Sequence, residues 1–283
     1  MKTGKRKEPI MGKPGLLTFN ENIMKFDNGG FAMPITGVSA GEDAAYGKPP
    51  YHIYVENINI DFETDYDAVA PFLPAPLEFA DENPVACVGV NNMFFTNFGT
   101  TMECYLGYRC LFEGEVWNYF PYWLIGAREG RTDVTAMQMG RELHGNGKKI
   151  ADITLTNEQN IVVGKVSRPS NMPLFTATVS PQRNVELPHE YEERTIDLRY
   201  IPGLSNDYAP EVCQLVGIRN MAYPYVHADG LCDVWTGPAS LEFHSKSPND
   251  PWHVNKVNKI LNATYGRYCR NIPPAFVMHD YLK

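Results

Sequence analysis

Short runs rich in apolar residues, separated by glycine, proline, asparagine and aspartate, make up most of the chain after residue 45. Runs of this length with turn residues between them are typical of β-strands. The pattern predicts strands at Tyr51 to Asp61, Pro84 to Phe95, Thr101 to Phe112, Val116 to Ile125, Lys149 to Leu155, Ile161 to Val166, Pro173 to Ser180, Thr195 to Ile201, Val212 to Ala222, Ala239 to Phe243, Tyr265 to Cys269 and Ala275 to Tyr281.

Helical patterns are few and short. They predict helices at Asp65 to Phe72, at Thr132 to Leu143 and at roughly Trp252 to Leu261. This spacing favours an α+β fold that is predominantly antiparallel β, arranged as a barrel, cone or sandwich rather than as alternating βαβ units.

Residues 1–45 are rich in glycine, proline, asparagine and lysine and have little periodicity. They predict an extended N-terminal arm ahead of one folded domain at residues 46–283. No apolar run follows the basic residues at the N-terminus, and no stretch has the roughly 20 apolar residues of a membrane span. We therefore expect a cytoplasmic protein that does not bind membranes.

Composition narrows the classes of partner. The 283 residues include 33 acidic and 25 basic ones, so the formal net charge is -8 and no broad positive field is available for nucleic acid. The six cysteines have no Cys-x-x-Cys pair, which favours buried free thiols, and the seven histidines have no paired metal-binding spacing. We expect no metal and no cofactor.

Two local patterns resemble catalytic motifs but lack their context. Gly37 to Gly41 matches the Gly-x-Ser-x-Gly nucleophile elbow, yet Pro34 precedes it and a poor helix follows. Gly140 to Lys149 lacks the first glycine and the hydroxyl residue of a phosphate-binding loop. The adjacent lysines that remain, Lys148 and Lys149, fit a solvated turn when judged by local pattern alone.

Five ordered motifs carry a resemblance to a known family. They are Gly140-Arg141-Glu142-Leu143 with Lys148-Lys149, Leu73 to Glu78, Phe112-Glu113-Gly114 with Tyr119, Trp235 to Pro238 with Leu241, and the ending His279 to Lys283. Together they resemble the acetoacetate decarboxylases over about residues 50–283. The resemblance implies that family's barrel or cone fold and a homo-oligomer.

The resemblance also implies roles for single residues. Lys148, the first lysine of the pair, corresponds to the family's Schiff-base lysine, and Glu103 corresponds to its active-site glutamate. Lys149, Arg141 and Glu142 are supporting candidates. Independently, Glu103 stands in an apolar strand, and a buried carboxylate is usually paired or functional. Weaker candidates for the pocket walls are Tyr122, Trp123 and Tyr281.

The chain departs from the family's pattern at three places. Val55 stands where the family has a substrate-contacting arginine, a second acidic residue is replaced near Cys87 or Val88, and Asn146-Gly147 stands in place of Tyr-Pro. These departures leave the imine chemistry intact and put the binding of a small substrate's carboxylate in doubt.

Imine formation requires a neutral amine, whereas an ordinary lysine titrates near pH 10. Bringing a lysine pKa to about 6 takes roughly 6 kcal/mol of destabilisation of the ammonium, from apolar burial or a nearby cation. The leading prediction is a metal-independent carbon–carbon lyase that decarboxylates a β-keto acid through a lysine imine. Aldol condensation or cleavage with dehydration by the same lysine, and a non-catalytic binder of a small carbonyl compound, are the alternatives.

Overall fold

The computed structural model describes residues 17–20, 23–26, 50–95, 99–126, 134–204 and 209–283. The N-terminal unit, residues 1–49, contains one antiparallel hairpin, β1 (Leu17–Asn20) with β2 (Ile23–Phe26). The rest of the predicted arm lies outside the described residues, as do Gly37 to Gly41. The domain division therefore stays a prediction.

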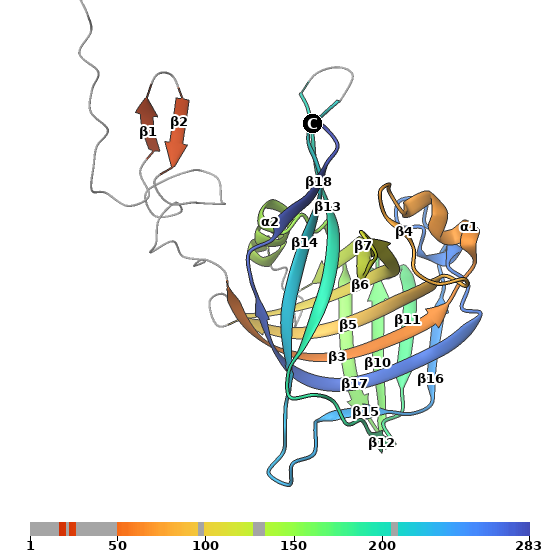
Figure 1. The fold of residues 1–283 in the computed structure, drawn as a ribbon. Coiled ribbons are helices and arrows are strands. Elements are labelled where there is room, and N and C mark those ends of the chain that lie inside the picture. The colour runs from red at the N-terminus through yellow and green to blue at the C-terminus, as the bar shows by residue number, and fades with distance from the viewer. Residues whose placement is uncertain (1–16, 21–22, 27–49, 96–98, 127–133, 205–208) are drawn as a thin grey trace, which may run out of the picture. The chain divides into compact units, whose positions relative to one another are not determined.

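The main unit, residues 50–283, contains two sheets. The larger has twelve strands and the smaller has four (Figure 1). The strands of the larger sheet are β3 (Tyr51–Glu63), β4 (Glu78–Phe79), β5 (Val85–Phe95), β6 (Gly99–Phe112), β7 (Glu115–Gly126), β8 (Lys148–Ile150), β12 (Arg183–Asn184), β13 (Tyr191–Pro202), β14 (Pro210–Pro224), β15 (Val234–Thr236), β17 (Lys259–Ile272) and β18 (Phe276–Asp280). Those of the smaller sheet are β9 (Asp152–Glu158), β10 (Ile161–Ser167), β11 (Pro173–Val179) and β16 (Ala239–Phe243).

Seven strands of the larger sheet close into a ring, in the order β17, β3, β5, β6, β7, β13 and β14. Antiparallel pairing of β14 with β17 completes it. The pairs β7 with β13 and β7 with β8 are parallel, and the other pairs are antiparallel. The predicted fold class, predominantly antiparallel β in a barrel or cone, is confirmed.

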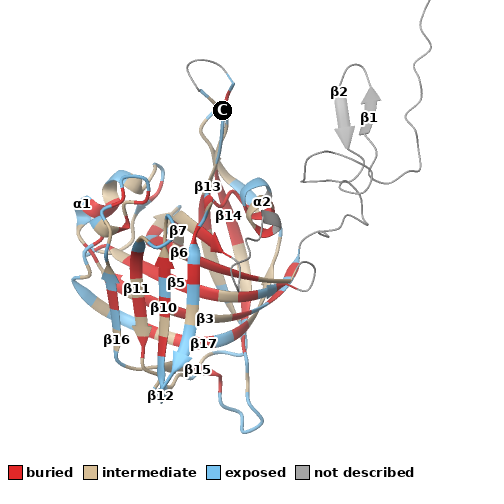
Figure 2. Ribbon diagram, turned by 180° about the vertical axis from the view of Figure 1, so that it is seen from behind, coloured by how far each residue is buried: buried red, intermediate tan, exposed pale blue. Residues whose placement is uncertain are grey.

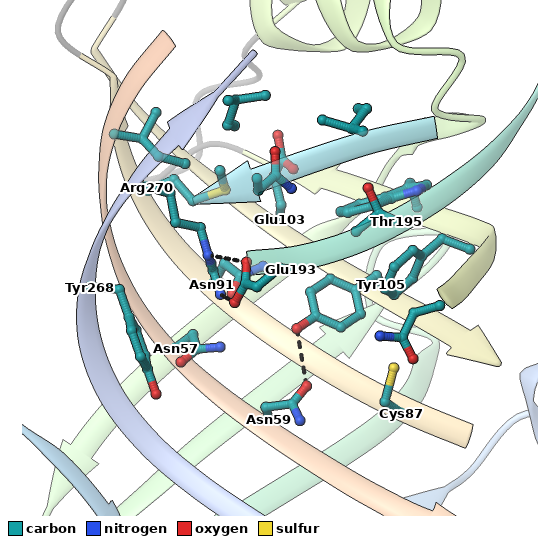
Figure 3. A pocket seen from close by; sticks show the side chains of 18 of the residues that line it. Asn57, Asn59, Cys87, Asn91, Glu103, Tyr105, Glu193, Thr195, Tyr268 and Arg270 are labelled. Atoms are coloured by element: carbon teal, nitrogen blue, oxygen red, sulfur yellow. Dashed lines mark hydrogen bonds and ion pairs between the residues drawn. The ribbon is translucent and has the colours of Figure 1, made fainter. Parts of the chain in front are cut away.

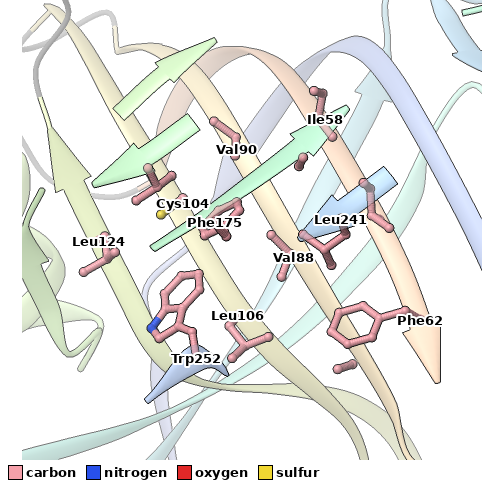
Figure 4. Packing of buried hydrophobic residues seen from close by; sticks show 14 of the residues in the cluster. Ile58, Phe62, Val88, Val90, Cys104, Leu106, Leu124, Phe175, Leu241 and Trp252 are labelled. Carbon is pink, nitrogen blue, oxygen red and sulfur yellow. The ribbon is translucent and has the colours of Figure 1, made fainter. Parts of the chain in front are cut away.

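The smaller sheet packs against the outside of this ring. Side chains that point outward from β3, β5 and β6, such as Ile58, Val88 and Leu106, are completely buried against Phe175 of β11 and Leu241 of β16 (Figures 2 and 4). Because side chains alternate between the faces of a strand, the residues between these point into the ring. The hydrophobic core thus lies between the ring and the smaller sheet, and the inward-pointing side chains line the interior of the ring.

Two of the three predicted helices are present. They are α1 (Tyr66–Val69), which continues as a 3₁₀ turn (Ala70–Phe72), and α2 (Val134–Leu143). The third prediction is wrong: only Trp252–Val254 forms a 3₁₀ turn. The Asn255 side chain donates to the Trp252 carbonyl at 3.1 Å, and Lys259 already begins β17, where it pairs with Glu63 of β3. No helix within the described ranges is long and apolar enough to cross a membrane.

The predicted strand Lys149 to Leu155 is also corrected. It is two strands in different sheets, β8 against β7 and β9 against β10, with Ala151 between them. All six cysteines are free, and four of them are buried.

Candidate active site

The interior of the ring holds a cavity of about 440 Å³ (Figure 3). Alternate residues of its strands line the cavity, for example Asn57 and Asn59 on β3, Asn91 on β5, and Glu103 and Tyr105 on β6. The register continues across the strands, since Asn57 pairs with Asn91 and Asn91 pairs with Glu103. One part of the cavity wall is therefore a row of polar groups that ends at a carboxylate.

Lys148 extends into this cavity and meets Glu103. The Lys148 Nζ lies 2.6 Å from the Glu103 Oε1, and each side chain is only 4% exposed. The Ala136 carbonyl accepts a longer bond from the same Nζ at 3.5 Å. This contact joins two positions that are 45 residues apart in the sequence. The catalytic roles of both residues stay predictions.

The link between α2 and β8 sets the position of Lys148. Gly145 has a positive φ of 75°, and the Asn146 amide donates to the Gly140 carbonyl at 3.0 Å, which ends the helix and turns the chain. Gly140 also makes room for the lysine, because a Cβ at Gly140 would lie 2.6 Å from the Lys148 Cε and 2.7 Å from its Nζ. The Lys148 side chain therefore packs directly against Gly140, where a larger residue would collide with it.

Lys149 points away from the cavity. Its Nζ donates to Asp250 Oδ1 and to the Asn249 carbonyl, both at 2.7 Å, and Asp250 also pairs with Arg168 at 2.9 Å. Because Asp250 is buried and holds both cations, it anchors the outer side of β8. Lys149 is therefore not a second cation beside Lys148 inside the cavity.

The other two supporting candidates lie outside the cavity lining. The Arg141 Nη1 donates to the Lys148 carbonyl at 3.2 Å, so it holds the backbone of the lysine rather than its amine. Glu142 is exposed. Arg141 thus supports the backbone of Lys148, and nothing in the structure explains the place of Glu142 in the motif.

The three weaker candidates, Tyr122, Trp123 and Tyr281, lie in different surroundings. Trp123 lines the cavity, with the Lys148 Nζ 6.0 Å from its ring centroid. Tyr122, on the opposite face of β7, packs in the hydrophobic core against Phe72 and Trp252. The Tyr281 hydroxyl donates to the Ala75 carbonyl. Of the three, only Trp123 belongs to the cavity wall.

Asp197 is a buried acid next to the site that the sequence reading missed. It accepts hydrogen bonds from Trp123 Nε1 at 2.6 Å and from Asn146 Nδ2 at 2.8 Å. Burial raises the pKa of Asp197 to about 7, although these two bonds and the nearby Lys148 oppose the rise. The sequence does offer one indication of a buried acid here, because Asp197 stands between the apolar residues Ile196 and Leu198.

His144 is a second residue that the sequence reading missed. It lines the cavity, is 4% exposed, and its Nε2 has no hydrogen-bond partner within the described parts of the chain. Burial, with a smaller contribution from Lys148, lowers the pKa of His144 to about 4. The imidazole is therefore neutral at neutral pH, and it adds no charge beside the lysine.

The departures noted in the sequence fall on different surfaces. Val55 is buried but does not line the cavity, Cys87 lines it, and Val88 is in the core. Asn146 lines the cavity and binds Asp197. Of the residues at these positions, Cys87 and Asn146 are thus the ones that face the cavity.

The geometry allows acid–base chemistry at an amine. Transfer of one proton from the Lys148 ammonium to the Glu103 carboxylate leaves a neutral amine and a neutral acid, and it removes both charges from a buried position. A neutral amine can attack a carbonyl, and a carboxylic acid in contact with it can give the resulting carbinolamine oxygen the proton needed to expel water.

A sequence model of the family described as acetoacetate decarboxylase (ADC) matches residues 32–282. The chain is similar to the decarboxylase DEC1 of Cochliobolus heterostrophus, with 27% identity over 253 residues, covering 83% of this chain and 94% of that one.

Two solved structures have a similar fold. The acetoacetate decarboxylase of Legionella pneumophila has a TM-score of 0.72 at 23% identity, covering 84% of this chain and 91% of that one. The enduracididine biosynthesis enzyme MppR, complexed with the condensation product of pyruvate and imidazole 4-carboxaldehyde, has a TM-score of 0.70 at 19% identity. It covers 91% of this chain and 99% of that one.

Proposed function

The chain belongs to the acetoacetate decarboxylase family, and we propose that it decarboxylates a β-keto acid through an imine of Lys148. That it is a decarboxylase or a related enzyme of this family follows from membership. The observation that supports the finer proposal is the buried contact between Lys148 and Glu103 at 2.6 Å on the wall of the cavity.

The reaction would begin with the neutral Lys148 amine. Its Nζ attacks the ketone carbon, and the carbinolamine loses its oxygen as water, which leaves a protonated imine. The bond to the carboxylate carbon then breaks, its electron pair moves toward the imine nitrogen, and carbon dioxide leaves. A proton adds to the carbon of the resulting enamine, and water hydrolyses the imine to release the ketone and the lysine.

Glu103 would move the protons in this sequence. It takes a proton from the Lys148 ammonium and returns it to the carbinolamine oxygen as water leaves. It then takes up a second proton from solvent and gives it to the enamine carbon. Each transfer needs a carboxyl within hydrogen-bond reach of the amine, and the 2.6 Å contact meets that requirement.

The apolar part of the cavity would favour the decarboxylation step itself. Met93, Phe95 and Met139 line the cavity together with Trp123. A carboxylate that becomes neutral carbon dioxide loses its charge, so a wall with little capacity to solvate that charge favours the product side.

A second function is aldol condensation with dehydration by the same lysine. It is supported by the fold shared with MppR, whose structure contains a condensation product of pyruvate and an aldehyde. Here the enamine would add to an aldehyde carbon rather than take a proton, and no carbon dioxide would leave. A binder without catalysis is the third candidate, and turnover of any carbonyl compound would count against it.

The experiment is carbon dioxide release from acetoacetate and longer 3-oxo acids. We expect release by the wild type, none above background by Lys148→Ala or Lys148→Arg, and only weakened release by Lys149→Ala. Lys149→Ala is the matched control because its ammonium binds Asp250 outside the cavity. Release by Lys148→Ala, or equal loss in both alanine variants, would remove Lys148 from the reaction. An aldehyde-dependent condensation product without gas release would favour the second function.

A further inference from the structure

A second ion pair lines the same cavity and has no role in the reaction above. Arg270 on β17 forms an ion pair with Glu193 on β13, in which Arg270 Nη2 donates to Glu193 Oε1 at 2.8 Å and Arg270 Nε lies 2.8 Å from Glu193 Oε2. Figure 3 shows both side chains pointing into the cavity. The arginine is 13% exposed and the glutamate 26%.

The guanidinium is fixed but only half used. Tyr268 packs beneath it, with the Arg270 Cζ 5.4 Å from the ring centroid. Glu193 accepts a hydrogen bond from Nη2 and lies within ion-pair distance of Nε, and Nε itself donates no hydrogen bond within the described parts of the chain. The end of a guanidinium, where Nη1 and Nη2 each present an N–H, can bind a carboxylate through two parallel hydrogen bonds.

Arg270 lies across the ring from Lys148. Lys148 enters on β8, which pairs with β7, and β17 is three strands from β7 through β13 and β14, or four through β6, β5 and β3. In a ring of seven strands no pair is farther apart. A ligand that reaches both groups must therefore extend from one side of the cavity to the other.

We propose that Arg270, oriented by Glu193, binds a substrate carboxylate remote from the carbonyl that reacts with Lys148. The substrate class is then an oxo acid with several atoms between the two groups and, for decarboxylation, a 3-oxo dicarboxylic acid. This inference rests on the proposed function.

The carboxylate that binds Arg270 is not the one that leaves. A guanidinium stabilises the ionised carboxylate of the ground state more than the neutral carbon dioxide that forms from it, so binding the leaving group would raise the barrier. The bound carboxylate instead orients the substrate. Acetoacetate has only the leaving carboxylate, so it cannot use Arg270 productively.

The test compares ketones that form imines but cannot decarboxylate by this route. The Lys148 adducts of 4-oxopentanoate and 5-oxohexanoate, and of the neutral 2-pentanone and 2-hexanone, are reduced with borohydride and quantified by mass spectrometry over a range of concentrations. We expect at least one oxo acid to half-saturate trapping at a concentration roughly 10- to 100-fold lower than its neutral partner, the size expected for hydrogen bonds to a charged group.

The variant that removes the pair is Arg270→Gln/Glu193→Gln, because a single change would leave one buried charge unpaired. Its preference for oxo acids should fall to less than threefold, with trapping of the neutral ketones retained. The matched control is Arg267→Gln/Asp233→Asn, which removes another ion pair of β17, between groups 3.2 Å apart and outside the cavity lining. Equal half-saturation by acids and neutral ketones in the wild type, or a preference that survives in the Arg270 variant, would overturn the proposal.

A second readout does not depend on the imine. Pentanoate, which carries the carboxylate without a carbonyl, should raise the melting temperature of the wild type and of the Arg267 control but not of the Arg270 variant. A wild type without this shift would contradict the carboxylate site. If pentanoate stabilises the wild type selectively while no ketone is trapped, the Arg270 site stands and the imine proposal fails.

Discussion

The proposed chemistry depends, at the scale of single residues, on one proton shared between Lys148 and Glu103. Replacing Glu103 by glutamine keeps the shape of the side chain but removes the group that accepts and returns that proton. We expect kcat for carbon dioxide release to fall about 10²- to 10⁴-fold, the usual contribution of a positioned acid or base, with KM changed only a few-fold. Steady-state kinetics measures both, and an unchanged kcat would exclude Glu103 from the mechanism.

Asp197 gives a prediction about stability and pH. Its pKa is raised by burial from 3.8 to about 7, so between these values the folded chain keeps a proton that the unfolded chain releases. The free energy of unfolding therefore falls as pH rises through this range, by on the order of 4 kcal/mol for this group, and the loss is complete above about pH 7.

Asp197→Asn cannot ionise and lacks this fall. Its free energy of unfolding relative to the wild type should increase steadily from about pH 4 to pH 7 and then stay level. Urea unfolding of both proteins at several pH values measures the difference, in which other groups such as His144 cancel. A difference that does not vary with pH would show that Asp197 is ionised throughout.

The family resemblance pointed to Lys148 and Glu103, whereas the strand pattern alone did not distinguish Lys148 from Lys149. Adjacent strand positions face opposite sides, and each side of the expected strand carried a mixture of residues. In the fold, Gly140 of the neighbouring helix leaves space for Lys148 on one side, and the distant Asp250 binds Lys149 on the other. Asp197 was missed because only the pairing of β13 with β7 brings it to the site. His144 is close to Lys148 in the sequence, but its local pattern did not show that it lines the cavity.

Among the elements, the helix α2 and the strand β8 determine the position of the reactive amine. Gly140→Ala would place a methyl group 2.6 Å from the Lys148 Cε. Because the lysine end is flexible, we expect it to move rather than the helix. Alanine also favours a helix over glycine by about 1 kcal/mol. Activity should therefore fall at least tenfold while the melting temperature is maintained or rises.

Gly147→Ala is the matched control, since a Cβ there would meet no atom within 4 Å. It should retain activity within a few-fold of the wild type. Kinetics together with thermal unfolding separates the two variants, and full activity in Gly140→Ala would contradict the close fit around the lysine.

Some secondary-structure elements could not be predicted from the local sequence pattern. The strands with clear apolar runs were predicted, whereas the segment from Trp252 to Leu261 was read as a helix. Its end instead pairs with β3, about 200 residues earlier, and those backbone bonds outweigh the local helical preference. The strand predicted at Lys149 to Leu155 was divided for the same reason, since its two halves pair with partners in different sheets.

At the scale of the whole molecule, closure of the ring creates the site. Barrel-like architecture followed from the number of strands and turns and from the family resemblance, and it is confirmed. The parallel pairing of β7 with β13 was not predictable, because the sequence of a strand does not specify which other strand it pairs with. That pairing and the contact of β14 with β17 bring Arg270 and Glu193 to face the cavity that holds Lys148.

The homo-oligomer implied by the resemblance stays a prediction. Exposed apolar side chains on β13 and β18, among them Tyr200, Ile201, Phe276 and Val277, are candidates for a contact between copies. Light scattering after size-exclusion chromatography should give a mass that is a multiple of 31.9 kDa. A single-chain mass at micromolar concentration would contradict it.

The central claim is that Lys148 forms the imine, and one measurement tests it most directly. The protein is incubated with acetoacetate and with longer 3-oxo acids, reduced with borohydride, digested and examined by mass spectrometry. We expect a reduced ketone adduct on the peptide that contains Lys148, with the modification on Lys148 itself and no adduct in Lys148→Arg. Turnover of a 3-oxo acid with no trappable adduct, or an adduct on Lys149, would contradict it.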